Sequence, residues 1–203
     1  MTEQPQIYLI SPPDFDIHTF PEELAKVLDA HDIACVRLAL ATQDEDHLAR
    51  AADACRDVAI ERDVAIVIDD HTMLAQRLGL DGVHLSDAGK SVRDARTALG
   101  VEAIVGSFCG TSRHDGMSAG EAGADYISFG PAGVSNLGTG AQVDFDLFKW
   151  WSEVIEVPVV AEGALTADVI ADLSQFTDFF GIREIWDADV PSKMLGDWIA
   201  RMS

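Results

Sequence analysis

Positively charged residues are scarce in this 203-residue chain. It has 14 lysines and arginines against 35 aspartates and glutamates, which gives a formal net charge of −21. A protein that binds a nucleic-acid backbone or an anionic membrane surface needs a basic face, so this composition argues against both kinds of partner. The excess of acids by itself indicates a soluble surface or a salty habitat, and it does not identify a ligand.

Cysteine is also rare, and long apolar runs are absent. Cys35, Cys55 and Cys109 have no metal-binding spacing, and an odd, sparse count is typical of a reduced, cytoplasmic protein. No run approaches the ~18 consecutive apolar residues of a membrane span. The first residues carry no basic segment of the kind that opens a secretory signal. The sequence therefore predicts a cytoplasmic protein without a membrane anchor.

Short apolar and β-branched runs recur along the whole chain and alternate with amphipathic helical patterns. Continuous runs of this kind are typical of parallel strands that are covered on both faces. The predicted strands are residues 7–10, 34–40, 64–68, 82–85, 103–108, 125–130, 157–163 and 179–185.

Eight strand–helix units in about 200 residues predict an α/β protein, a single small (β/α)8 TIM barrel that spans residues 1–203. The alternative is a doubly wound sheet, which favours a glycine-rich dinucleotide turn after its first strand. The segment "LISPPDFD" follows the first predicted strand here and contains no such turn. One long loop, residues 131–144, is rich in glycine and is typical of a lid or binding loop.

Polar residues at the carboxyl ends of the predicted strands form the candidate site, because ligands bind at this end of such barrels. We interpret His84 and Glu162 as candidate acid–base residues. Asp70 and Asp87 are candidate ligands of Mg²⁺, which prefers carboxylate oxygens. The candidate substrate-binding residues are Arg37, Ser107, Ser128, Gly130, Gly163 and Arg183.

Most of these interpretations have a structural alternative. One carboxylate of the Asp69–Asp70 pair can instead cap the helix that begins near His71. A histidine on an apolar strand, such as His84, is typical of a core position with satisfied ring nitrogens. Cys109 has no histidine placed beside it by the sequence and reads as an inert thiol.

Several segments resemble the thiamine phosphate synthase/TenI family. They are "IYLIS", "VIDDHTMLAQRLGLDGVHL", "IVGSFC", "AGADYISFGP" and "VPVVAEGAL", in order over nearly the whole chain. The resemblance implies a (β/α)8 barrel, in agreement with the strand count. It also implies a role in thiamine biosynthesis, as a transferase that joins hydroxymethylpyrimidine diphosphate to a thiazole phosphate. That reaction uses Mg²⁺, and in the alignment with the family motif Asp70 matches a metal-binding aspartate.

The chain departs from the family at the positions that carry charge. Ala39 and Ala41 stand where the family places the cations of its second strand, and Arg37 takes the place of a glutamine. Gly110 replaces the histidine that acts in the tautomerases of the family. Glu162 precedes the phosphate-binding loop after the seventh strand, where a carboxylate repels a phosphate.

The sequence therefore predicts a thiamine phosphate synthase/TenI-like barrel that lacks most of the diphosphate-binding cations, so that synthase activity is in question. Two alternatives stay open, a working synthase with a rebuilt site and a non-catalytic ligand-binding or regulatory barrel. In each case the expected partner is a small heterocycle at the carboxyl end of the barrel. Helix faces between barrels also allow a homo-oligomer.

Overall fold

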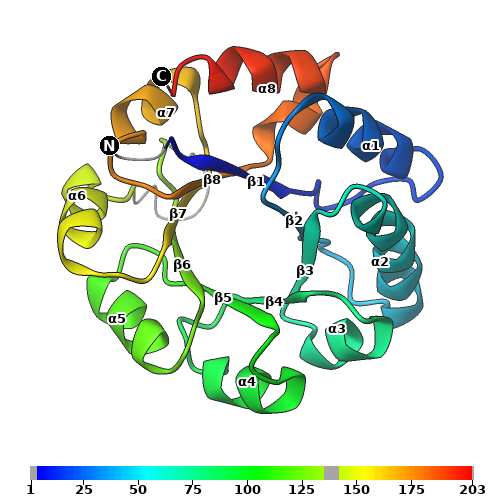
Figure 1. The fold of residues 1–203 in the computed structure, drawn as a ribbon, viewed down its shortest axis with the longest axis horizontal. Helices are drawn as coiled ribbons and strands as arrows, with labels where there is room; N and C mark the ends of the chain where they lie inside the picture. The colour runs from blue at the N-terminus through cyan, green and yellow to red at the C-terminus, as the bar shows by residue number, and fades with distance from the viewer. Residues whose placement is uncertain (1–3, 135–141, 203) are drawn as a thin grey trace.

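The computed structural model describes residues 4–134 and 142–202, and it has eight parallel strands closed into one barrel in sequence order (Figure 1). The strands are β1 Gln6–Ile10, β2 Cys35–Leu38, β3 Ala65–Asp69, β4 Gly82–Leu85, β5 Ile104–Phe108, β6 Tyr126–Phe129, β7 Val159–Glu162 and β8 Phe179–Ile182. Each of the eight predicted strands is present, and the (β/α)8 barrel is confirmed.

The helices form a ring outside the barrel (Figure 1). They are α1 Phe20–Ala30, α2 Glu45–Ile60, α3 Thr72–Leu78, α4 Val92–Leu99, α5 Arg113–Glu121, α6 Phe145–Val154, α7 Ala167–Leu173, α8 Pro191–Ile199 and the 3-10 helix η1 Glu184–Asp187. None of the helices in the described ranges is long and apolar enough to cross a bilayer.

The strand ends differ from the prediction at β8. The sequence run continues to residue 185, but the strand ends at Ile182. Arg183 adopts helical backbone angles, with φ −114° and ψ −28°, and Glu184 begins η1. The placement of Arg183 and Glu184 inside the eighth strand is therefore wrong, because the backbone turns there and carries both residues onto the barrel rim. Within the long loop, residues 135–141 lie outside the described residues.

The apolar core has two parts. The larger part fills the space between the strands and the helices, and it includes Leu9, Phe129 and Trp151. The smaller part lies inside the barrel and includes Tyr8, Val67, Tyr126 and Val160 with two further buried residues. Side chains alternate along each strand, so neighbouring residues divide between these two parts.

The amino end of the barrel is held by three aspartates that each precede an even-numbered strand. The carboxylates of Asp81, Asp125 and Asp178 accept hydrogen bonds at 2.7–2.8 Å from the backbone N–H groups of Ile66, Val105 and Val159, on the preceding strands. The backbone N–H of each aspartate donates in return to the carbonyl of the same partner. This paired contact fixes the start of one strand against its neighbour three times around the barrel.

Replacing Asp178 by alanine is expected to lower the free energy of unfolding by about 1 kcal/mol, because the N–H of Val159 loses its charged acceptor. Urea denaturation of the two proteins measures the difference. Asp172→Ala, an exposed aspartate on α7, is the matched control and should leave stability unchanged within experimental error. Equal stability of Asp178→Ala and the parent would show that this contact does not hold the strands.

Candidate functional site

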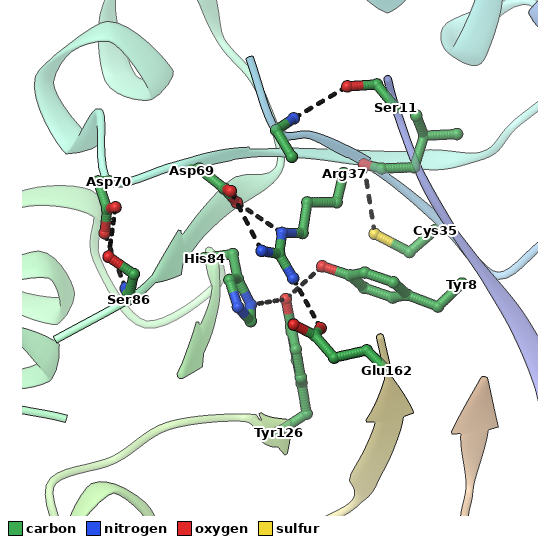
Figure 2. Close-up of polar contacts among 12 residues, drawn as sticks. Tyr8, Ser11, Cys35, Arg37, Asp69, Asp70, His84, Ser86, Tyr126 and Glu162 are labelled. Carbon is green, nitrogen blue, oxygen red and sulfur yellow. Dashed lines mark hydrogen bonds and ion pairs between the residues drawn. The ribbon is translucent and has the colours of Figure 1, made fainter. Parts of the chain in front are cut away.

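A buried arginine lies at the centre of the candidate site. The Nε and Nη2 atoms of Arg37, on β2, donate to the two oxygens of Asp69 at 2.6 and 3.1 Å. Its Nη1 donates to Oε2 of Glu162 at 2.7 Å. Figure 2 shows the guanidinium between these two carboxylates, which come from β3 and from β7 on the other side of the barrel. Each of the three guanidinium nitrogens of Arg37 therefore donates a hydrogen bond to a carboxylate.

Burial and charge act against each other in this group. Burial disfavours the charged guanidinium, but Glu162 and Asp69 outweigh it and raise the pKa of Arg37 well above its usual value. Burial raises the pKa of Asp69 and of Glu162, and the nearby guanidinium offsets part of that rise. The arginine stays charged at any ordinary pH, and its carboxylates are the groups that can take up protons.

A glycine makes room for the Glu162 side chain. A Cβ atom built on Gly181 of β8 would lie 2.9 Å from the Cβ of Glu162, closer than two such carbons approach. The carboxylate can therefore extend over the barrel interior toward Arg37. With residues of β1, β2 and β8 it lines a cavity of about 240 Å³ at the carboxyl end. The lining residues are Ile10, Arg37, Ala39, Glu162, Gly163, Gly181, Arg183 and Glu184.

Below the arginine, two tyrosines and a histidine form a chain of hydrogen bonds. The hydroxyls of Tyr8 and Tyr126 are 2.5 Å apart, and Nδ1 of His84 is 2.9 Å from the Tyr126 hydroxyl (Figure 2). Burial and the charge of Arg37 lower the pKa of His84 well below its usual value, so the ring is neutral. Its Nε2 has no hydrogen-bond partner within the described residues.

The two proposed metal ligands lie on the loops after β3 and β4. Both oxygens of Asp70 accept from Ser86, one from its N–H at 2.8 Å and one from its hydroxyl at 2.6 Å. One oxygen of Asp87 accepts from the Ser91 hydroxyl at 2.5 Å, and the other is buried without a partner in the described part of the chain.

Both oxygens of Asp70 already accept hydrogen bonds from protein groups, whereas one oxygen of Asp87 is buried without a partner in the described part of the chain. Among residues 4–134 and 142–202, no group of three or more His, Cys, Asp or Glu side chains is arranged to hold a metal ion. Asp70 uses both oxygens on Ser86, and Asp69 uses both on Arg37. The magnesium hypothesis stays a prediction, and we build no chemical step on it.

The capping alternative for the acid pair is wrong. Helix α3 has His71 at its N-cap and no side-chain hydrogen bond to the cap. Asp69 and Asp70 bind Arg37 and Ser86 instead, as described above. Asp70 has a positive φ of 55°, which turns its side chain back toward the loop after β4. The helix begins without a carboxylate because both acids are committed elsewhere.

The remaining candidates divide between the interior and the outside of the barrel. Ser128 lies on β6 two residues after Tyr126, on the same face, and its hydroxyl is buried without a partner in the described ranges. Gly130 lies two residues after Ser128 and contacts Glu162. Gly163 and the exposed Arg183 line the cavity. Arg37, Ser128, Gly130, Glu162, Gly163 and Arg183 are therefore brought together at one end.

Ser107 is not brought into this group. Its neighbour Gly106 faces Tyr126 in the interior, so Ser107 faces the helices, where its hydroxyl lies 3.6 Å from Sγ of Cys109. Burial raises the pKa of the Cys109 thiol to about 11, so it stays protonated at neutral pH. This agrees with an inert thiol at position 109.

Sequence reasoning missed two residues of the site. Tyr8 and Tyr126 lie at interior positions of their strands, and the alternation of β1 and β6 is the signal that could have found them. The sequence places Glu184 in the eighth predicted strand and leaves its role open, because its contacts with backbone N–H groups on the rim depend on where β8 ends.

The comparisons with known proteins agree with this architecture. The family model for thiamine monophosphate synthase matches residues 7–178. The chain is 42% identical to a thiamine-phosphate synthase of Rhodospirillum centenum over 181 residues, which covers 87% of this chain and 86% of the relative. It is 38% identical to that of Erythrobacter litoralis over 196 residues, with 93% and 92% covered.

Solved structures show the same fold. A thiamine phosphate pyrophosphorylase from Pyrococcus furiosus superimposes with a TM-score of 0.83 at 18% identity, and 97% of this chain and 95% of that one are covered. A 3-hexulose-6-phosphate synthase superimposes with a TM-score of 0.70 at 14% identity, with 97% and 99% covered. At these identities the likeness supports the barrel alone.

Replacing Arg37 by methionine is expected to lower the free energy of unfolding by about 3 kcal/mol at neutral pH, since two buried carboxylates lose their counter-charge. The loss should shrink in mild acid, where those carboxyls take up protons in the folded protein. Urea denaturation across pH measures both effects. Arg93→Met, an exposed arginine on α4, is the control, and an equal loss in the two variants would contradict the ion-pair account.

The buried neutral His84 is expected to make the protein acid-sensitive. Its folded pKa lies below the unfolded value of ~6.5, so the unfolded chain binds the extra proton. Stability is therefore complete above that pH and falls by up to about 1.4 kcal/mol per pH unit below it. His84→Gln should remove this part of the pH slope, and His114→Gln, on the exposed face of α5, should keep it. An unchanged slope in His84→Gln would refute the assignment.

Proposed function

The chain belongs to the thiamine monophosphate synthase family, and on this premise we propose that it binds a heterocyclic ligand of thiamine metabolism at the carboxyl end of the barrel. We further propose that it makes thiamine phosphate poorly, because the charges that a leaving diphosphate requires are missing or already paired.

The reaction of the family sets the physical demand. A bond forms between the two heterocycles while diphosphate leaves, and negative charge develops on the departing group. Such charge is stabilised by Mg²⁺ and by cationic side chains aimed at it. A site that performs this reaction therefore needs free cations, and preferably a metal, beside the leaving group.

The pairing of Arg37 with Asp69 and Glu162 is the observation that carries the proposal. Three of the five N–H donors of the guanidinium bind these carboxylates, which balance its charge, and Ala39 next to it supplies no charge. The groups around this mouth are two guanidiniums and three carboxylates, so it has no excess of positive charge. A neutral or cationic heterocycle fits these charges better than a diphosphate does.

The dimensions of the mouth support the same proposal. The cavity measures about 240 Å³. Pockets that enclose a drug-sized ligand usually measure ~300–1,000 Å³. A single small heterocycle suits this volume, and a further cavity of about 630 Å³ is lined by Asp70 and His71 after β3.

A working synthase is the second candidate, favoured by the relatives of 42% and 38% identity that carry that name. In that case cations from elsewhere on the rim would take the place of the missing ones. Exposed Lys90, after β4, and exposed Arg183, after β8, lie on loops at the carboxyl end. This candidate requires that Asp70 and one of these cations act on the diphosphate.

A synthase assay separates the two candidates. Purified protein is incubated with Mg²⁺, hydroxymethylpyrimidine diphosphate and thiazole phosphate, and thiamine phosphate is scored. Each lost charge-assisted contact is worth roughly 1.5–3 kcal/mol, so the loss of the two cations at Ala39 and Ala41 should slow turnover by roughly a hundredfold or more relative to a family synthase run in parallel. Turnover at the rate of that synthase would contradict the proposal.

Two variants and a binding measurement complete the test. Asp70→Ala abolishes any genuine turnover if the site has been rebuilt, whereas Asp172→Ala, on the outer ring, should not affect it. Calorimetric titration with the uncharged pyrimidine and thiazole alcohols should detect binding that Arg37→Met or Glu162→Gln weakens. Absence of both binding and turnover in folded protein would refute the proposed function.

A further inference from the structure

The carboxylate of Glu184 bridges two loops on the barrel rim. Its Oε1 accepts a hydrogen bond from the backbone N–H of Leu165, in the loop after β7, at 3.0 Å. Its Oε2 accepts from the backbone N–H of Arg183, directly after β8, also at 3.0 Å. One side-chain carboxylate therefore satisfies an N–H group from each of two consecutive loops.

These two loops are the ones that hold phosphate in many (β/α)8 barrels, where the groups after strands seven and eight form the anion site. Backbone N–H groups that converge from such loops bind anions without any cationic side chain. The loop after β7 has this form here, with positive φ at Gly163 (84°) and Ala164 (53°), and its next residue, Leu165, is buried. In this chain the N–H groups of Leu165 and Arg183 already bind an anionic group of the protein itself, the carboxylate of Glu184.

A second carboxylate reinforces the effect. Glu162 lines the same cavity of about 240 Å³ as Glu184. A phosphate at this rim would have to displace Glu184 from both N–H groups and would then face two carboxylates. A hydroxyl meets no such penalty, because it can donate a hydrogen bond to either carboxylate.

We infer that Glu184 acts as a built-in substitute for a ligand phosphate, so that the barrel mouth selects a heterocycle that carries a free hydroxyl instead of a phosphate at this end. The ligand class rests on the proposed function, whereas the occupation of the two N–H groups by Glu184 does not. Glu184 is thus a specificity-determining residue, and the enclosing loops keep the geometry of an anion site.

Inorganic phosphate is the probe that tests the occupation, because it depends on neither heterocycle binding nor turnover. Its titration is followed through the ¹⁵N amide shifts of Leu165 and Arg183, in the full chain. In the parent protein both shifts should stay constant through the millimolar range. In Glu184→Ala both should move and saturate, with phosphate affinity raised roughly tenfold or more by two freed donors and one removed negative charge.

Controls separate this result from a general loss of negative charge. Glu153→Ala removes an exposed carboxylate from the far end of α6 and should behave as the parent does. Glu184→Gln keeps the length of the side chain but loses the charge and one acceptor, so it should gain less phosphate affinity than Glu184→Ala. Parent protein that binds phosphate through these amides, or folded Glu184→Ala that does not, would overturn the inference.

The ligand class has its own readout. The parent should bind the thiazole alcohol more tightly than the thiazole phosphate, and Glu184→Ala should shift this ratio toward the phosphate by roughly tenfold. An unchanged ratio would overturn the specificity role. If neither compound binds any of the proteins, the proposed function fails, while the inorganic phosphate titration still decides whether Glu184 fills the anion site.

Discussion

The pairing of one buried guanidinium with two carboxylates organises the carboxyl end of this barrel. A charge inside a barrel is tolerated only when opposite charges and hydrogen bonds compensate it. Arg37 obtains both from Asp69 and Glu162, which come from β3 and β7. Burial, together with the charge of Arg37, keeps His84 neutral, and the paired carboxylates leave the mouth without an excess of positive charge. The charge balance of the interior and the proposed preference against a diphosphate therefore depend on the same two ion pairs.

The sequence predicts the fold of this chain much more completely than it predicts the contacts of the candidate site. The strands are continuous apolar runs because helices cover them outside and side chains fill them inside, and this pattern is local. The contact between Arg37 and Glu162 spans 125 positions of sequence and exists only once the barrel closes. The end of β8 was missed for a related reason. The run "FFGIREI" has the pattern of one strand, but the strand ends at Ile182 and Glu184 accepts a hydrogen bond from Leu165 on the rim.

Aspartates in this chain have two roles that their sequence context does not distinguish. Asp69 ends β3 and Asp70 follows it at the ligand end, whereas Asp81 and Asp178 precede a strand and bind the backbone of the neighbouring strand. All four border apolar runs. Only the direction of the strand separates a residue of the site from a residue that holds the barrel together, which is why an acid count alone overstates the candidate metal ligands.

The three paired aspartate contacts at the amino end also bear on how this protein can evolve. Strand registration is secured at the amino end of the barrel, opposite the candidate site. Substitutions around the opposite opening can accumulate without loosening that registration, provided that the interior charges remain balanced. A barrel with this division can change the residues around its mouth while its strands keep their register.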